Sequence, residues 1–143
     1  MDIEITGIKE LEASFTELES KVIAANTEAL LQSANVVKSK AQELAPKAND
    51  HSKSGSQHKG KVRKTPPDHI ADSIPISKIK NVKGNSQIDV GWKLNDNSQY
   101  VYAKWVEWGT SKMPPRPFLQ EALDDSEGEI LSIFNSKIGQ LRL

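Results

Sequence analysis

No glycine or proline interrupts the chain between Gly7 and Pro46. Apolar side chains recur in this stretch every three or four residues, which is the pattern of one helix face. They stand at positions 8, 11, 15, 18, 22, 25 and 29, and then, one residue out of step, at 30, 34, 37, 41 and 44. The pattern fits one helix of about 55 Å, or two helices broken near residues 19–21. In either case we expect a core-facing helix, and small side chains on its stripe allow close packing: Ala25, Ala29, Ala34 and Ala41.

The segment after Pro46, residues 47–68, is poor in apolar residues. Apart from its prolines only Ala48 and Val62 are apolar, so the segment cannot bury enough surface to offset its ordering entropy. The composition predicts a long mobile loop inserted in the domain. Its basic residues are candidates to face DNA or a partner protein: Lys47, Lys53, Lys59, Lys61, Arg63 and Lys64.

Two later segments alternate apolar and polar residues. The first covers residues 74–80, where a proline restricts the strand to an edge or to its start, and the second covers residues 86–92. Gly84 and Asn85 between them form a turn signal, so the two segments predict a β-hairpin. Residues 2–6 alternate in the same way and predict a short edge strand.

An aromatic-rich block at residues 100–123 holds five of the eight aromatic residues of the chain. Val101, Trp105 and Trp108 stand at helical spacing. Gly109 is placed to end this helix, because glycine adopts a positive φ at little cost. We therefore expect a helix that stops at Trp108 and a positive φ at Gly109.

A proline-rich elbow and a final helix follow. Prolines at 114, 115 and 117 exclude a helix interior. Pro117 can begin the last helix, where its missing N–H costs nothing, and apolar residues then continue at helical spacing from Phe118. Trp105 and Phe118 are expected core residues that bridge the two helices. The elements predict an α+β fold with one domain over residues 1–143: a small antiparallel sheet packed against a long N-terminal helix and a C-terminal helix.

The aromatic block also carries a family resemblance. A Glu-aromatic-Gly-Thr pattern, followed several residues later by Pro-Phe-Leu at the start of the last helix, resembles the small tail-completion or head–tail joining proteins of long-tailed bacteriophages. The residues that match are Val106, Glu107, Trp108, Gly109, Thr110, Pro117, Phe118, Leu119 and Ala122.

The resemblance implies a short helix and then a long one before Pro46. It implies a structural protein of the virion neck or tail, made in the bacterial cytoplasm, that acts in a homo-oligomeric ring, a hexamer by family analogy. The implied partners are further copies of the chain, a head-side connector, and tail-tube or tail-terminator proteins, with DNA passing through the ring. Thr65 is followed by Pro66 here, where the family often has Thr-Gly, so the geometry of the loop does not transfer.

Composition argues against several classes of function. Nineteen basic and nineteen acidic residues give no net charge, which favours neither nucleic acid nor an acidic substrate. The chain has no cysteine, and its three histidines match no zinc-ligand spacing, so we expect no metal or cofactor. No apolar run approaches the roughly 20 residues of a membrane helix. No nucleophile elbow or phosphate-binding loop occurs. We interpret Glu107 as a partner of nearby backbone or of Arg116, and we expect neither catalysis nor a small-molecule substrate.

A nucleic-acid-binding module is the alternative interpretation. Basic side chains of residues 47–68 would contact phosphates, and aromatic residues of the block 100–108 would stack on bases, as suits single strands. The zero net charge and the helical spacing of the aromatic residues, which indicates core positions, stand against it. A small hydrolase is a third class, and it has almost no support in the sequence.

Overall fold

The computed structural model describes residues 7–47, 57–58, 61–62, 69–93, 95 and 100–141. In chain order it contains α1 (Ile8–Leu44), β1 (Gln57–His58), β2 (Lys61–Val62), the 3₁₀ helix η1 (Ile70–Ser73), β3 (Lys80–Val82), β4 (Asn85–Gln87), α2 (Ala103–Trp108) and α3 (Phe118–Gly139). The strand expected over residues 2–6 lies outside the described residues. Long helices beside small antiparallel sheets confirm the α+β class.

Helix α1 is continuous, so the break expected near residues 19–21 is wrong. The hydroxyl groups on this part of the helix do not disrupt it. Those of Ser14, Thr16 and Ser20 each donate a hydrogen bond to the carbonyl oxygen four residues earlier, at 2.9 to 3.0 Å. Because the stretch contains no glycine or proline, the helix continues to Leu44, two residues before Pro46.

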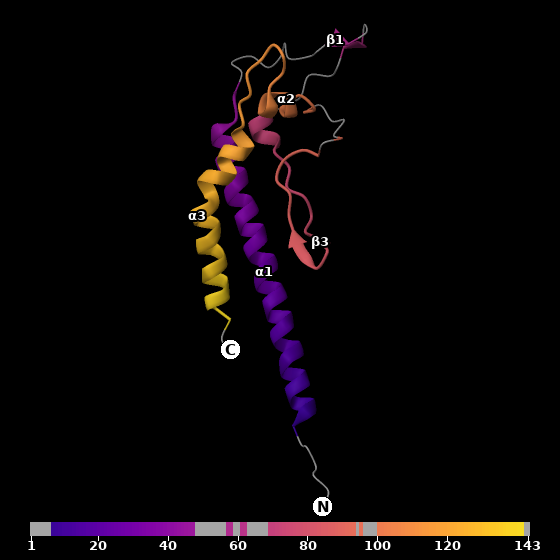
Figure 1. Cartoon of the computed structure of the whole chain (residues 1–143), viewed down its shortest axis with the longest axis vertical. Helices are drawn as coiled ribbons and strands as arrows, with labels where there is room; N and C mark the ends of the chain where they lie inside the picture. Colours follow the sequence, from indigo (N-terminus) through magenta and orange to yellow (C-terminus); the bar gives the residue numbers. More distant parts are fainter. Residues whose placement is uncertain are drawn as a thin grey trace, which may run out of the picture.

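Helix α3 lies antiparallel to α1 and covers only the C-terminal part of it (Figure 1). Close approach of the two backbones is allowed by small buried side chains. These are Ala29, Ala34 and Ala41 of α1 and Ala122 of α3. Near the end of α3, the Lys137 ammonium lies 2.7 Å from the carboxylate of Glu28. Beyond this ion pair, α1 extends alone toward its N-terminus (Figure 1).

The hydrophobic core lies where α1 ends and α3 begins, and η1 and α2 close it. Its largest fully buried side chains are those of Phe118 and Ile74. The other members are mostly small: Val37, Ala41, Ala45, Ile70, Ala71, Ala103 and Ala122. Because alanine contributes little apolar area, the core depends strongly on its few large side chains.

Strands β3 and β4 form the predicted hairpin. Gly84 and the residue before it have φ values of 83° and 53°, as in the two-residue turns that match the strand twist. Pairing resumes at Ile76 and Val90. Between the two paired regions, residues 77–79 oppose residues 88–89, and the extra residue on the first strand makes a β-bulge. The continuous ladder is therefore shorter than the predicted strands.

The segment 47–68, predicted to be a long mobile loop, is described only in part. Lys47 follows α1 and is exposed. Strands β1 and β2 pair antiparallel, with Gln57 opposite Val62. The strands of the described residues thus form two separate two-stranded sheets, and the rest of the segment lies outside those residues.

Candidate functional site

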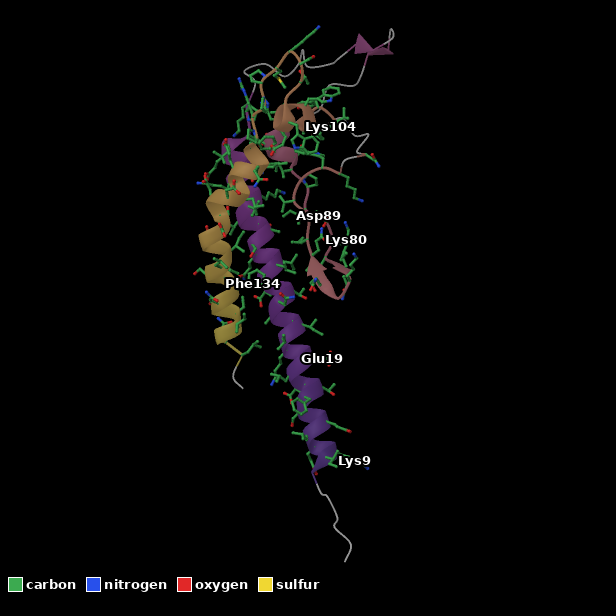
Figure 2. All side chains as sticks on the ribbon, viewed as in Figure 1. Lys9, Glu19, Lys80, Asp89, Lys104 and Phe134 are labelled. Carbon is green, nitrogen blue, oxygen red and sulfur yellow. The ribbon has the colours of Figure 1, made fainter. Side chains whose placement is uncertain are left out.

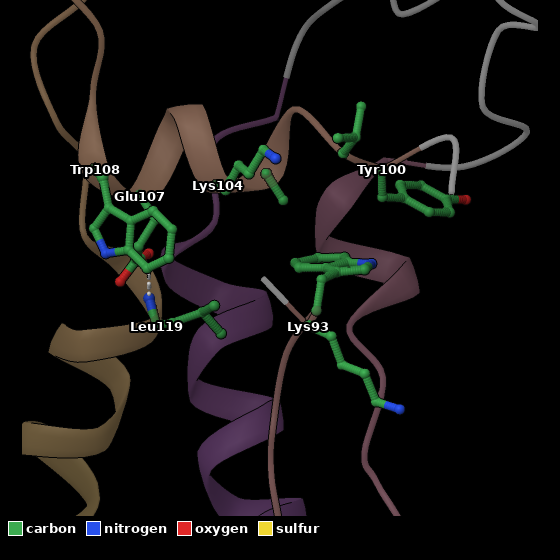
Figure 3. Close-up of a pocket in the computed structure, with 9 residues that line it drawn as sticks. Lys93, Tyr100, Lys104, Glu107, Trp108 and Leu119 are labelled. Atoms are coloured by element: carbon green, nitrogen blue, oxygen red, sulfur yellow. Dashed lines mark hydrogen bonds between the residues drawn. The ribbon is translucent and has the colours of Figure 1, made fainter. Parts of the chain in front are cut away.

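The side chain of Glu107 joins α2 to the start of α3. Helix α2 buries Ala103 and Glu107. The Glu107 carboxylate accepts hydrogen bonds from the backbone N–H groups of Leu119 and Gln120, each at 3.0 Å, and Figure 3 shows the first. These N–H groups belong to the first turn of α3, where they lack partners within the helix and the helix dipole favours negative charge. Glu107 therefore caps α3 from another helix, which confirms its interpretation as a partner of backbone.

Gly109 ends α2 in a conformation that is nearly exclusive to glycine. Its φ of 73° confirms the prediction, and its ψ of −179° differs from the usual left-handed helix stop. A Cβ added here would lie 2.7 Å from the nitrogen of Pro115 and 2.8 Å from the carbonyl oxygen of Met113. Backbone hydrogen bonds between Thr110 and Met113, at 2.8 and 3.3 Å, close the turn, and the Arg116 N–H donates to a carbonyl of α2 at 2.8 Å. The elbow is thus bound to α2.

The aromatic side chains of the block divide between core and surface. Phe118 is 2% exposed and belongs to the core, as predicted. Trp105 is 43% exposed, so the prediction that it bridges the helices from the core is wrong. The short helix α2 presents Ala103 and Glu107, at positions i and i+4, to the interior, which leaves Trp105 and Trp108 on other faces. Trp108 is 65% exposed.

A small hollow lies beside Trp108 (Figure 3). The rings of Trp92 and Tyr100 line it with centroids 6.0 Å apart and planes tilted by 31°, and Lys104 lies at its edge. The neighbouring Tyr102 packs against the core and does not line the hollow. Burial raises the pKa of the Tyr102 phenol above its usual value, and the charge of Tyr100 adds to the rise. The hollow measures about 60 Å³. Ligand pockets typically measure about 300–1,000 Å³, so this hollow cannot hold a substrate.

The residues that carried the family resemblance form one joint between α2 and α3. Some pack in or against the core: Val106, Phe118, Leu119 and Ala122. Four others connect α2 to α3: Glu107, Gly109, Thr110 and Pro117. The remaining residue, Trp108, faces solvent. The block is mainly a structural joint, and Trp108 is its large side chain most accessible to a partner.

Two of the six predicted basic residues lie in the part of the chain that the structure describes. Lys47 is exposed, and Lys61 lies in β2, where only its backbone is described. The other four lie outside the described residues: Lys53, Lys59, Arg63 and Lys64. Their role in facing DNA or a partner stays a prediction.

Sequence reasoning missed an exposed apolar surface on the N-terminal part of α1. Ile8, Leu11 and Phe15 are 49%, 56% and 62% exposed, so the expectation that this stretch faces the core is wrong. The spacing identifies the apolar face of the helix. However, the buried C-terminal part of α1 has the same kind of spacing, so the pattern did not indicate that the N-terminal part is exposed.

The described residues contain neither a metal-binding cluster of three or more suitable side chains nor a helix that is long and apolar enough to cross a membrane. Two hollows of this part of the chain, of about 540 and 570 Å³, lie along α1 and have more apolar than polar lining residues. A third, of about 430 Å³, lies between α1 and α3 and is lined mainly by polar residues.

A family of phage proteins matches most of the chain. The family model described as "Bacteriophage HK97-gp10, putative tail-component" covers residues 9–109. The chain belongs to this HK97-gp10-like family. The match includes α1 from Lys9 onward, the β3–β4 hairpin and α2, and it ends at Gly109, before α3. No curated protein and no solved structure matches the chain.

Membership confirms the resemblance carried by the aromatic block. The HK97-gp10-like family is a family of phage tail components and not a known enzyme family, so the chain has a structural role in a phage virion. The Pro117–Ala122 part of the pattern lies beyond the matched residues. Its packing against Glu107 nonetheless makes it one unit with the matched end of α2.

Proposed function

We propose that this HK97-gp10-like protein is a head–tail connector, or tail-completion protein, that acts in a homo-oligomeric ring in the virion neck. The observation that carries the proposal is the apolar surface of α1. Ile8, Leu11 and Phe15 leave about half or more of their area in water. On a small protein, a contiguous apolar surface of this kind indicates a site of protein association.

The proposed ring is a hexamer by family analogy and lies between a head-side connector and tail-tube or tail-terminator proteins. The α2–α3 joint supports this role, because Glu107 and Gly109 hold two helices in a fixed relation. A fixed joint presents Trp108 to a partner at little cost in ordering entropy. Basic residues of segment 47–68 would face passing DNA or an acidic partner surface.

Inactivation of the gene in the phage tests the proposal. We expect filled heads and separate tails, with few joined particles, in electron micrographs of the lysate. A plasmid copy of the gene should restore joining and infectivity. Purified wild-type virions should contain the protein at several copies per particle. Normal particles from the inactivated phage would contradict the proposal.

A plasmid copy in which the basic residues of segment 47–68 are replaced tests their role separately. Lys53, Lys59, Lys61, Arg63 and Lys64 become Ser in this variant. Exposed charges contribute little to stability, so the melting temperature should stay nearly unchanged while joining is impaired. A variant that restores infectivity fully would leave the segment without a role in assembly.

A nucleic-acid-binding module is the second candidate, and one observation favours it. Trp105 and Trp108 are exposed, so they are accessible for stacking on bases, contrary to the core positions that their spacing indicated. A single-stranded oligonucleotide should then shift in a native gel with the wild-type protein. Trp108→Ala should weaken that shift by about tenfold, as expected for the loss of one stacked base.

A further inference from the structure

Two hollows follow one another along the side of α1 that lies between α3 and the β3–β4 hairpin. They measure about 540 and about 570 Å³, and Phe134 of α3 lines both. Successive parts of α1 line them: Val22, Ala25 and Ala29 in the first, and Leu30, Ala34 and Val37 in the second. Together they form a mostly apolar trough, which we call the α1 groove. Its volume is in the range of side chains from a docked segment rather than of a single water molecule.

The same helix carries an apolar stripe that the described residues leave mostly uncovered. The N-terminal stripe consists of Ile8, Leu11, Phe15, Leu18 and Val22. In Figure 2, Lys9 lies on the part of α1 that extends past α3 and past the hairpin. The stripe runs at the same spacing into the floor of the α1 groove, because Val22 belongs to both.

The stripe and the groove match in length. The stripe from Ile8 to Val22 is about 21 Å long, and the groove floor from Val22 to Val37 is about 22 Å long, at about 1.5 Å per residue. The stripe repeats at i, i+3 and i+7, which is the spacing by which an amphipathic helix fits an apolar groove.

The stripe also matches the hairpin wall of the groove in charge. The helix around the stripe is acidic, since Glu10, Glu12, Glu17 and Glu19 outnumber Lys9 and Lys21. The hairpin that flanks the groove is basic, since Lys78, Lys80, Lys83 and Lys93 stand against a single acid, Asp89. An incoming stripe would therefore bring an acidic helix beside a basic hairpin, which steers the encounter and discriminates against other orientations.

We propose that the N-terminal stripe of one copy docks in the α1 groove of the next copy. The proposal rests on the ring that we propose as the function, and it names the contact that builds it. One copy cannot make the contact with itself, because the stripe and the groove lie on the same unbroken helix. The two surfaces differ, so each copy gives its stripe to one neighbour and receives the stripe of another. Such head-to-tail contacts close into a ring when the rotation between copies allows it.

Cysteine cross-linking tests the contact directly, because the chain has no cysteine of its own. Phe15→Cys is introduced in one batch of protein and Leu123→Cys, at the wall of the groove, in a second batch that carries a size tag. The exposed side chains at both positions make the substitutions tolerable. After mixing and mild oxidation, we expect a disulfide-linked pair of one tagged and one untagged copy. Leu11→Cys and Leu18→Cys, on either side of Phe15 along the stripe, test whether the docked helix is shifted by one turn.

Ala13→Cys is the matched control, because Ala13 lies on the same part of α1 and away from the stripe. Cross-linking to Leu123→Cys should follow the stripe, with strong yields at one or more of positions 11, 15 and 18 and little at 13. Equal yields at Ala13→Cys and at the stripe positions, or no mixed product at any of them, would overturn the proposal. So would a stripe cysteine that, in intact virions, links to another virion protein instead of to the groove.

Sedimentation of concentrated protein gives an independent readout. Wild-type protein should form species larger than a dimer, and Phe15→Asp should weaken association by about tenfold or more, since one large apolar side chain leaves the interface. Ala13→Asp should associate like wild type. Circular dichroism should show equal helix content in both variants. A wild type that stays monomeric, or that closes as a dimer only, would contradict head-to-tail docking.

The outcomes separate this inference from the proposed function. If Phe15→Asp restores joining in the phage without the gene and no mixed disulfide forms, the docking contact is wrong and the neck role stands. If the expected disulfides form but inactivation of the gene leaves virions normal, the contact stands and the neck role is wrong.

Discussion

The two ends of α1 have similar apolar patterns and opposite environments. At the C-terminal end, Val37 and Ala41 are buried in the core with Phe118 of α3. At the N-terminal end, Ile8, Leu11 and Phe15 repeat at the same kind of spacing in water. Helical periodicity therefore identifies the apolar face of a helix, but it does not show whether the same chain covers that face.

A matched pair of substitutions should give the largest contrast between the two ends. Phe118→Ala should lower the free energy of unfolding by about 3–5 kcal/mol, because it opens a cavity in a core of small residues. Phe15→Ala, at an exposed position, should change the free energy of unfolding of the monomer by about 0.5 kcal/mol or less. Urea denaturation at low protein concentration measures both. Similar losses would mean that the N-terminal end is packed within one copy.

The elbow that holds the packed end together gives the next effect. Gly109→Val should destabilise the protein by about 1–3 kcal/mol from backbone strain, with a further loss from the contacts at 2.7 and 2.8 Å. Gly128→Ala is the control, because no atom lies within 4 Å of the added Cβ in the middle of α3. It should stabilise by about 0.5–1 kcal/mol. Thermal melts followed at 222 nm would show opposite shifts, and a stabilised Gly109→Val would refute the geometry of the elbow.

Enlarging an alanine should be costly at one end of α1 and harmless at the other. Ala41 has no exposed area, so Ala41→Leu should overpack the core and cost about 1–3 kcal/mol. Ala13 is exposed, and Ala13→Leu should lie within about 0.5 kcal/mol of wild type. Urea denaturation of the two variants measures both effects, as shifts of the unfolding midpoint at an unchanged dependence of the unfolding free energy on urea concentration. An unaffected Ala41→Leu would show that the helices are not in close contact there.

The smallest effect belongs to the hairpin, whose strands β3 and β4 are exposed throughout. A hydrogen bond from Lys80, and a second from Gln87, lowers the pKa of Asp89 below its ordinary value of 3.8. A lowered pKa in the folded state stabilises the fold above the unfolded pKa, and this stabilisation is lost as the pH falls below about 4. Asp89→Asn should therefore cost less than about 1 kcal/mol at pH 7 and nothing near pH 2. An equal cost at both pH values would assign it to packing instead of charge.

The sequence predicted the features that depend on local geometry. Gly109 and Phe118 behave as expected, because a glycine stop and a helix start after Pro117 are decided by a few neighbouring residues. Trp105 did not, because a short helix has room for only one inward face, and Ala103 with Glu107 occupies it. The size and hydrophobicity of Trp105 favoured a core position for it. Glu107 is buried instead, because its carboxylate caps the first turn of α3.

The remaining misses concern information that was not local. The break near residues 19–21 came from the family resemblance, and the residues themselves contain no interruption there. The β-bulge between the Ile76–Val90 pair and the β3–β4 ladder shifts the pairing by one residue, which alternation alone does not reveal. The α1 groove arises from the placement of three separate elements, so no pattern within any one of them could predict it.

The uninterrupted course of α1 has a consequence for changes in its length. Each residue deleted from the helix between the stripe and the packed end would turn the stripe by about 100° and draw it back by about 1.5 Å. After a deletion of one residue, Ile8 and Leu11 would therefore no longer face the surface that they now contact or are able to contact. A deletion of seven residues would nearly restore their direction on a shorter arm. Natural relatives should therefore vary the length of this helix mainly by numbers of residues that keep the stripe in its direction, such as seven.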